Sequence, residues 1–433
     1  MIILSFILFL VAMTGIGILS ARKSKSTTTD YILASRDVGP VATSLSAVST
    51  CHSGFMFIGM IGFTYTIGIS AIWLIISWMI GDYVAWKMVY KRLRKQTEAC
   101  NISTVSGFIS HHFNHKKQRI IQWVSGSFIL VFLAVYAAAQ LTAGSKALNA
   151  MLGWPVNTGI VLGAVIVGIY SVAGGIRASI WTDVAQSIIM LFSMIGLVTV
   201  ALFHLGGLGQ LFDALSAINP SLVSLIPTNL QFGFPLYILG WIAFGLGVIG
   251  QPHIIVRPMA ISSPNHIQPA MRLYLLWYLI FSICAIGVGL AARVILPELS
   301  AVDQELALPK MAISLLPSIF VGGILAGLFS ATISTADSQV LTCSATITQD
   351  LFPKGKQRIM ASKLATSFIL EPNIPWQWAL LLVALMEKMY QSTWDHTALG
   401  FPDLSVASLR QIMMTRVLSG LTLWRLLGLL WLI

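Results

Sequence analysis

The sequence predicts an all-α protein that crosses a membrane many times. Of its 433 residues, 56% are hydrophobic and 9% are charged, whereas soluble domains average about 45–50% apolar and about 25% charged residues. Nine stretches are apolar and long enough to cross a bilayer, which takes about 20 residues in a helix. Positive charge is concentrated in alternate connections between these stretches. A soluble protein is therefore excluded.

The predicted spans follow one another from the N-terminus. The first, Ile2–Ser20, lacks the basic start and the small-residue cleavage site of a signal peptide, so we expect a retained helix. The others are Val41–Thr66, Ile69–Val89, Ile120–Leu141, Val156–Val172, Ile180–His204, Pro235–Ile255, Leu273–Leu296 and Ile319–Thr348.

Positive charges orient these spans. With the N-terminus outside, 19 Lys and Arg residues fall in inner connections, and only Lys146, Arg293 and Lys310 fall in outer ones. Lys and Arg collect in cytoplasmic loops of membrane proteins. The sequence therefore predicts an outside N-terminus. The net charge of +11 is an orientation signal, and no nucleic-acid partner is expected.

Few other polar signals indicate chemistry. His111, His112 and His115 lie among basic residues without a nearby Cys or carboxylate, so a solvated loop is expected rather than a metal site. The four cysteines form no CxxC pair and are expected to be free thiols. The sequence contains no recognisable nucleophile–base pair and no phosphate-binding loop. We expect neither an enzyme nor an organic cofactor.

The second span is unusually polar for a helix that faces lipid. It carries hydroxyl and small residues from Thr43 to Gly54, including Ser49, Thr50 and Ser53. Such residues weaken a helix or let another helix approach closely. Broken membrane helices bind ions and substrates through their freed backbone groups. The segment is therefore either a packing interface or a binding site.

The ninth span repeats this polar character. A small-residue stripe, Gly322–Gly327, precedes Ser334, Thr335 and Asp337. Ser334 and Asp337 are three residues apart and share a helix face. Hydroxyl and carboxylate oxygens suit a hard cation such as Na⁺, and an ionisable residue inside a span suggests function. The alternative is that the hydroxyls bond only to their own helix backbone.

Several stretches together resemble the sodium/solute symporter family, and its sodium/proline symporter branch most closely. They occur in the expected order over about residues 1–363. The matching stretches are Asp30–Leu33 with Gly39-Pro40, Leu45–Ala47 with Ser53-Gly54, Gly174–Ala178 with Trp181–Asp183 and Gln186, Gly250–Arg257, and Ser334-Thr335 with Cys343-Ser344 and Asp350-Leu351.

The resemblance implies a five-plus-five inverted-repeat transporter fold with a discontinuous first core helix and one extra preceding helix. It also implies symport of a small organic solute with Na⁺. The expected sodium ligands are the carbonyls of Ser49, His52 and Ala331 and the hydroxyls of Ser334 and Thr335. The expected substrate-binding residues are Ser49, Thr50, Cys51, Ser53, Tyr136, Phe244, Val248 and Pro252. Asp183 is expected to act in gating or ion exit.

This chain departs from the proline branch at the expected cavity. Cys51 stands where that branch carries Asp, and Phe244 and Val248 stand where it carries Trp and Tyr. We hypothesise that Asp337 restores the missing negative charge as a sixth sodium-site residue, and that His52 either pairs with it or brings in a proton. The alternatives are a packed His52 and an Asp337 bonded to Gln339 or water.

The C-terminal part differs from the rest. Residues 1–365 form the expected transport domain, whereas residues 366–433 show no motif of the family. Ala379–Met386 is too short to span, and Val417–Ile433 carries Arg425 near its middle. This tail is either an unusual ending that packs on the core or an aberrant segment that leaves the second repeat incomplete.

The sequence thus favours a Na⁺-coupled symporter of a small solute, most simply an amino acid such as proline, in a bacterial cytoplasmic (inner) membrane. The alternatives are a transporter-like membrane sensor and a non-functional truncated symporter. Na⁺, the solute and the lipid bilayer are the expected partners, and the oligomeric state is open.

Overall fold

The computed structural model describes residues 1–370 apart from residues 26, 228–229, 231, 302 and 353–357. The C-terminal expectations beyond residue 370 lie outside the described residues. Within them the chain is helical, and its only β-bridge joins Val38 to Ile261. The α-helices are α1 (Ile2–Ala21), α2 (Thr28–Leu33), α3 (Pro40–Cys51), α4 (Gly54–Phe57), α5 (Gly59–Ile67), α6 (Ile72–Val84), α7 (Lys91–Ala99), α8 (Val105–Ser110), α9 (His115–Leu152), α10 (Val156–Leu205), α11 (Leu208–Ile218), α12 (Gly233–Gly245), α13 (Pro252–Ala260), α14 (Ile267–Ile295), α15 (Ala307–Leu315), α16 (Ser318–Ala345) and α17 (Arg358–Ile369).

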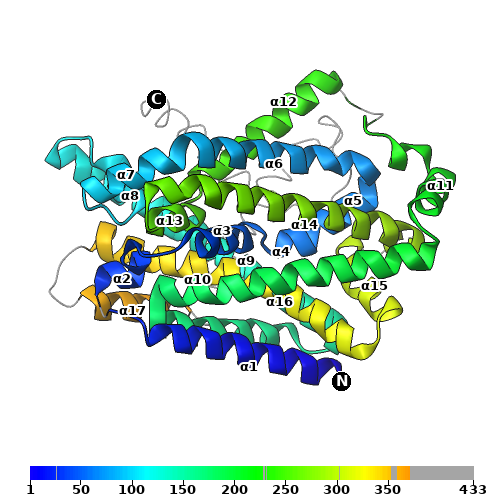
Figure 1. The fold of residues 1–433 in the computed structure, drawn as a ribbon, viewed down its shortest axis with the longest axis horizontal. Helices are drawn as coiled ribbons and strands as arrows, with labels where there is room; N and C mark the ends of the chain where they lie inside the picture. The colour runs from blue at the N-terminus through cyan, green and yellow to red at the C-terminus, as the bar shows by residue number, and fades with distance from the viewer. Residues whose placement is uncertain (26, 228–229, 231, 302, 353–357, 371–433) are drawn as a thin grey trace.

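The long helices lie side by side in one bundle (Figure 1). The short helices α2, α7, α8 and α17 lie at one end of this bundle, and α11 and α15 lie at the other (Figure 1). In the described part of the chain, seven helical runs are long and apolar enough to cross a membrane. These runs account for the nine predicted spans because two of them each contain parts of two spans.

Helix α10 contains two predicted spans. It has 50 residues, and a straight α-helix of that length would extend about 75 Å, more than twice the hydrocarbon thickness of a bilayer. Gly175 breaks the helix with φ 58° and ψ −143°, a region that residues with a Cβ rarely adopt. A Cβ on Gly175 would also collide with Tyr31 of α2. The glycine thus joins two spans through a tight bend under α2.

Two spans are broken inside the bundle. The first break, predicted from the sequence, separates α3 from α4 at His52 and Ser53. The second separates α12 from α13, with a short 3₁₀ helix, η5 (Leu246–Gly250), between them. The sequence analysis treated this second region as one continuous span. Its signal was the glycine-rich approach to Pro252, which lacks the N–H that a continuous helix needs.

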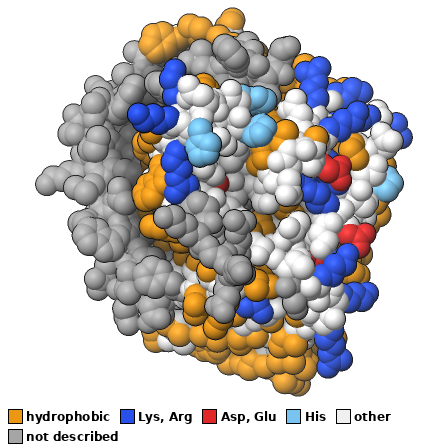
Figure 2. Space-filling model, turned by 90° about the vertical axis from the view of Figure 1, so that its left-hand side faces the viewer, with side chains coloured by type: hydrophobic (Ala, Val, Ile, Leu, Met, Phe, Trp, Pro, Cys, Tyr) orange, Lys and Arg blue, Asp and Glu red, His pale blue; other side chains and the backbone are white. Residues whose placement is uncertain are grey.

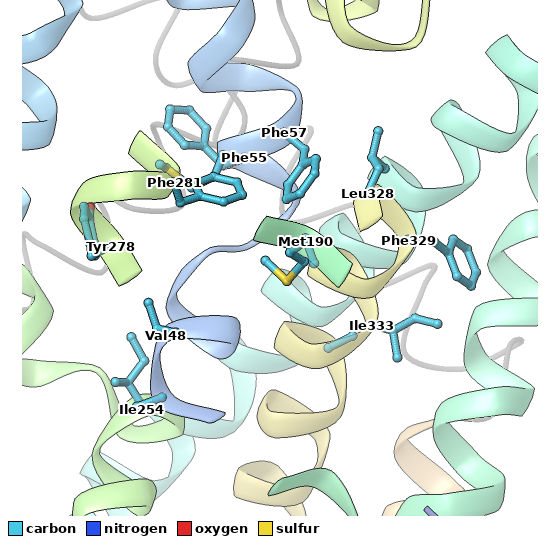
Figure 3. Packing of buried hydrophobic residues seen from close by; sticks show 14 of the residues in the cluster. Val48, Phe55, Phe57, Met190, Ile254, Tyr278, Phe281, Leu328, Phe329 and Ile333 are labelled. Atoms are coloured by element: carbon cyan, nitrogen blue, oxygen red, sulfur yellow. The ribbon is translucent and has the colours of Figure 1, made fainter. Parts of the chain in front are cut away.

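The two broken spans are held close to α6. Helices α6 and α12 approach so closely that a Cβ on Gly245 would overlap the carbonyl of Ser77, and one on Gly81 would overlap the carbonyl of Gly245. Around the first break, the rings of Phe55, Phe57, Tyr278 and Phe281 gather with Val48 (Figure 3). The breaks therefore lie in a packed interior rather than at the lipid surface.

Basic side chains gather at the end that carries α2, α7 and α8. Figure 2 shows this end with many Lys and Arg side chains and few Asp and Glu. Three arginines that the sequence analysis counted among the inner connections are instead buried in the structure, namely Arg94, Arg177 and Arg257. Their side chains are part of the protein interior at the end predicted to face the cytoplasm.

Candidate functional site

The break between α3 and α4 exposes backbone groups to the interior. His52 has φ −82° and ψ 73°, and Ser53 has φ −68° and ψ 179°. The Gly54 N–H, which a continuous helix would satisfy itself, donates to Oε1 of Gln140 from α9 at 2.9 Å. Tyr136, also on α9, donates from its hydroxyl to the Ser53 Oγ at 3.3 Å. Helix α9 thus supports the break with two polar side chains.

Oxygen atoms from α3 and α16 meet at this break. Ser334 Oγ lies 3.1 Å from the Ser49 carbonyl oxygen and 3.2 Å from that of Ala331. Thr335 Oγ1 lies 3.0 Å from the carbonyl oxygens of both Thr50 and Ala331. All five residues are buried. We call these three carbonyl and two hydroxyl oxygens the oxygen cluster.

The oxygen cluster contains most of the predicted sodium ligands. Ser49, Ala331, Ser334 and Thr335 are brought together as expected. The carbonyl of Thr50 takes part, while the hydrogen bonds of the two hydroxyls do not extend to His52. A hard cation prefers several oxygen ligands of this kind. Each hydroxyl now satisfies a carbonyl and can turn its lone pairs toward a cation.

His52 and Asp337 do not pair. The His52 ring contacts a carbonyl of its own helix, with Nδ1 3.0 Å from the Val48 oxygen. It packs edge-on against Trp277, Tyr278 and Phe281 of α14, with ring centroids 4.3–5.0 Å apart. The hypothesis of a His52–Asp337 pair is therefore wrong. An imidazole enclosed by aromatic rings is a packing residue of the break.

Asp337 belongs to a buried polar network with Asp183 and Arg257. Its Oδ2 accepts from the Tyr170 hydroxyl at 2.7 Å. Its Oδ1 lies 3.0 Å from Ser179 Oγ and 2.8 Å from Ser338 Oγ. These contacts replace the predicted alternative of a bond to Gln339. The three charged side chains of the network are fully buried.

Arg257 connects the two carboxylates. Its Nη2 donates to Asp183 Oδ2 at 3.0 Å and to Ser179 Oγ at 2.9 Å. The same nitrogen contacts Ser338 Oγ, so the two serines bridge Arg257 to Asp337. Two carboxylates thus share one guanidinium in a low-dielectric setting. Burial of an uncompensated charge is costly, and the hydroxyl groups offset this cost by donating to the second carboxylate.

The network adjoins the oxygen cluster. Ser46 Oγ donates to Asp183 Oδ2 at 2.6 Å, and Thr50 Oγ1 lies 3.5 Å from the same oxygen. Thr50 Oγ1 also lies 3.2 Å from Ser338 Oγ. The side chain of Thr50 therefore contacts the charged network, while its carbonyl belongs to the oxygen cluster. A movement of the chain at the break would therefore change the contacts of both the oxygen cluster and the charged network.

The predicted substrate-binding residues lie in several places. Tyr136 contacts Ser53 and packs edge-on against the ring of His253, next to Pro252. Val248 is buried in η5. Phe244 instead contacts Trp78 and Trp241, with centroids 5.6 and 5.8 Å apart. Ser53, Tyr136 and Pro252 are thus grouped at the break, whereas Phe244 packs on α6.

A pocket extends from Pro252 toward the end that carries the basic side chains. Its lining includes Pro252, Val256 and Met259 from α13, Thr342 and Thr346 from α16 and η9 (Thr346–Leu351), and Thr104. The lining is mostly apolar with a few hydroxyl groups. Its free volume is about 20 Å³, which is space for about one water molecule.

Charged contacts hold both ends of the bundle. At one end, the Asp350 carboxylate accepts from Thr104 at 2.7 Å, from Gln122 at 2.9 Å and from Ser106. At the other end, Lys146 bonds Asp303 at 2.7 Å and Glu305 at 2.6 Å.

Sequence reasoning missed three residues that support the site. Arg257 was counted as a loop charge, although it ends the run Gly250–Arg257 that carries part of the resemblance. Tyr170 and Gln140 lie in spans without any local polar pattern. Their partners are far away along the chain, at Asp337 and Gly54, so only the fold reveals their role.

Comparisons with known proteins agree with this geometry. The model of the sodium:solute symporter family matches residues 31–394. A high-affinity proline transporter of Bacillus subtilis is 32% identical over 79% of this chain and 72% of its own length. A sodium/proline symporter of Staphylococcus aureus is 33% identical over 78% of this chain, which spans 65% of that relative's length.

Solved structures confirm the predicted fold class. A Na⁺-coupled sialic acid symporter in a substrate-bound, outward-open state is similar with a TM-score of 0.76 at 18% identity, covering 98% of this chain and 85% of its own. A transporter of the nucleobase-cation-symport-1 family has a TM-score of 0.53 at 15% identity, covering 84% and 79%. At these identities the likeness establishes the inverted-repeat fold alone.

Proposed function

Because the chain belongs to the sodium:solute symporter family, we propose that it couples Na⁺ entry to the uptake of a small organic solute, most simply an amino acid such as proline. Its relatives named above are transporters of proline. We place it in a bacterial cytoplasmic membrane with the N-terminus outside, and we assign transport to residues 1–365. The family match extends past that limit to residue 394.

The oxygen cluster is the observation that carries this proposal. It places each of two hydroxyls of α16 within hydrogen-bond distance of one carbonyl of the broken helix and of the Ala331 carbonyl. Burial of so many oxygens without a donor surplus favours a small cation as their common partner. Na⁺ at this point would join α3 to α16. His52 and Asp337 would then shape the site from outside the oxygen cluster.

The substrate is proposed to bind beside the break. Ser49, Thr50, Cys51 and Ser53 supply polar groups from the broken segment, and Tyr136 supplies a hydroxyl from α9. Val248 and Pro252 come from the second broken span, with Phe244 one turn away. Broken helices present free backbone groups to a solute at the membrane midplane. Release is proposed through the pocket below Pro252.

Asp183 is proposed to act in gating. It contacts Ser46 and Thr50 of α3 and pairs with Arg257 of α13. It therefore joins the two broken spans just below the oxygen cluster. If α3 shifts when Na⁺ leaves, these contacts must rearrange, and the path toward the pocket opens.

Uptake into proteoliposomes tests the proposal. Radiolabelled proline, other amino acids and short carboxylates are supplied with an inward Na⁺ gradient, with K⁺ in its place, or with a pH gradient alone. We expect concentrative uptake of at least one solute only with the Na⁺ gradient. Uptake that is equal in K⁺, or driven by the pH gradient alone, would contradict Na⁺ coupling.

A further inference from the structure

Asp82 is a buried carboxylate that the proposed mechanism does not use. It lies on α6 and is 1% exposed. Among the described residues only the Tyr274 hydroxyl can donate to it, and neither oxygen has a donor with strict hydrogen-bond geometry. The protein's other buried aspartates within the bundle, Asp183 and Asp337, each accept several hydrogen bonds. A buried carboxylate with one tyrosine hydroxyl as its donor and no paired cation is unusual and indicates a missing partner.

The surroundings of Asp82 contain no cation. The groups that interact with it electrostatically are Cys51 at the end of α3, Tyr274 and Tyr278 on α14, and Tyr90 at the end of η3 (Ala85–Tyr90), the π-helix that follows α6. The Tyr90 hydroxyl has no partner within the described part of the chain, and the Tyr274 hydroxyl is shared between Asp82 and Cys51. Buried oxygens thus face one another with nothing to neutralise the charge.

The other neighbours add no charge. Helix α12 carries Tyr237, whose ring packs against Trp241 and Phe234, and η5 has no titratable residue. Lys87 follows on the same helical run but is exposed. Close backbone contact between Gly81 and Gly245 excludes water from this side. An ionised Asp82 would therefore be desolvated without compensation.

A proton fits this site better than Na⁺. Na⁺ needs several oxygen ligands, and the oxygen cluster supplies five of them, including backbone carbonyls. Around Asp82 the available groups are aromatic hydroxyls, a thiol and aromatic rings. The rings of Trp86 and Tyr274, 5.3 Å apart, close the site. A proton needs only one carboxylate oxygen and removes the charge entirely.

Resting on the proposed function, we propose that Asp82 is a proton-binding site that must be neutral for the transporter to close around the break in α3. Cys51, at that break, is its neighbour, so opening of the broken segment lets water reach the carboxylate. Water stabilises the ionised form. At high pH Asp82 is then ionised and hydrated, so the transporter stays open at the break. Transport therefore slows as the pH rises.

The first test detects the proton without transport. Infrared spectra of the protein in liposomes, free of Na⁺ and solute, are recorded across a pH series. We expect a protonated-carboxyl C=O band at neutral pH that disappears in Asp82→Asn and persists in Asp82→Glu. Asp213→Asn, which changes an exposed aspartate on α11, is the matched control. Identical bands in the wild type and Asp82→Asn would overturn the proposal.

The second test follows uptake against pH. Alkaline pH is expected to inhibit Na⁺-driven proline uptake by the wild type and by Asp213→Asn, and Asp82→Asn is expected to lose this inhibition while it still requires Na⁺. Equal alkaline inhibition in Asp82→Asn would contradict the proton site. If no variant takes up solute, the proposed function fails, while the infrared band still decides whether Asp82 holds a proton.

Discussion

Arg257 donates to Asp183 at 3.0 Å, and neither side chain is exposed. Such a pair contributes little net stability because desolvation offsets the attraction, but removal of one partner leaves a buried charge. Arg257 also holds Ser179 and Ser338, which bond Asp337. Its guanidinium therefore acts on both buried carboxylates, on Asp183 directly and on Asp337 through the two serines.

Substitutions at this pair test its role. Removal of one partner of a buried pair costs about 3–5 kcal/mol, so we expect Arg257→Gln or Asp183→Asn alone to lower the thermal unfolding temperature clearly. The double variant should recover part of the loss. Arg272→Gln, at an exposed arginine of α14, is the control. Additive losses in the double variant would show that the two residues act independently.

Residues of the site differ in how visible they are in the sequence. Ser334 and Thr335 stand in a polar stretch of an apolar span, and the sequence indicated them correctly as neighbours of the broken helix. The partners of Asp337 were not predictable, because Tyr170 lies 167 positions away in an unremarkable apolar run. Local pattern reveals a polar residue inside a membrane span, but only packing decides which partner satisfies it.

Two membrane spans are broken within the bundle, one between α3 and α4 and the other between α12 and α13. Glycines allow the close helix contact beside the second break. The first break was predictable from the family resemblance, because the hydroxyl and glycine residues alone were also compatible with a packing interface. The second was not, because Pro235–Ile255 reads as one apolar run and its Pro252 stands near the predicted end. The double span in α10 was predicted as two helices, and Gly175 explains the bend between them.

Gly245 provides a test of helix contact. A methyl group there would overlap the backbone of Ser77 on α6, and overpacking typically costs about 1–3 kcal/mol. We expect Gly245→Ala to reduce thermal stability and transport together. At Gly240, where a Cβ would meet nothing within 4 Å, Ala should be tolerated. Equal melting temperatures for the two variants would contradict this close contact.

The stability that the contact between α2 and α10 contributes depends on pH through Asp30. Burial alone would raise its pKa, but the Arg177 guanidinium, 2.6 Å away, the Lys25 N–H and the Ser35 hydroxyl hold it below the ordinary value of 3.8. Because the folded pKa is depressed, the ionised carboxylate stabilises the fold above the unfolded value. This stabilisation disappears as the pH falls through the folded pKa.

The corresponding measurement compares melting temperatures of the wild type and Asp30→Asn across pH. We expect the melting temperature of Asp30→Asn to lie below that of the wild type by a constant amount near neutral pH. This difference should narrow only below about pH 4, because the pKa of an unfolded Asp is about 3.9. Asp37→Asn, at an exposed aspartate nearby, serves as the control. A deficit that is the same at pH 3 and pH 7 would show that the charge of Asp30 is not what stabilises the contact.

The whole molecule is a bundle with charged contacts at its two ends and polar networks at its centre. Lys146 bonds Asp303 and Glu305 at the end near α15, and Asp350 accepts several hydrogen bonds at the end near α8. Alternating access requires these ends to open in turn. The sequence predicted the number and order of the spans because hydropathy reflects the bilayer directly.

The orientation of the bundle is open to a simple chemical test. Cys100 is the exposed cysteine, while Cys284 and Cys343 are buried and Cys51 is partly so. Cys100 lies at the basic end, which is predicted to face the cytoplasm. A membrane-impermeant maleimide should label it in inside-out vesicles and not in intact cells, and Cys100→Ser should abolish the signal. Labelling in intact cells would reverse the orientation.

The oxygen cluster is tested most directly by the Na⁺ concentration that gives half-maximal solute uptake. Thr335→Ala removes one ligand, and loss of about 1.4 kcal/mol or more should raise this concentration about tenfold. Thr142, an exposed threonine of α9, makes the same bond to its own helix at 3.0 Å, so Thr142→Ala is the matched control. We predict a shift in Thr335→Ala alone. Unchanged Na⁺ dependence in Thr335→Ala would contradict a sodium site between α3 and α16.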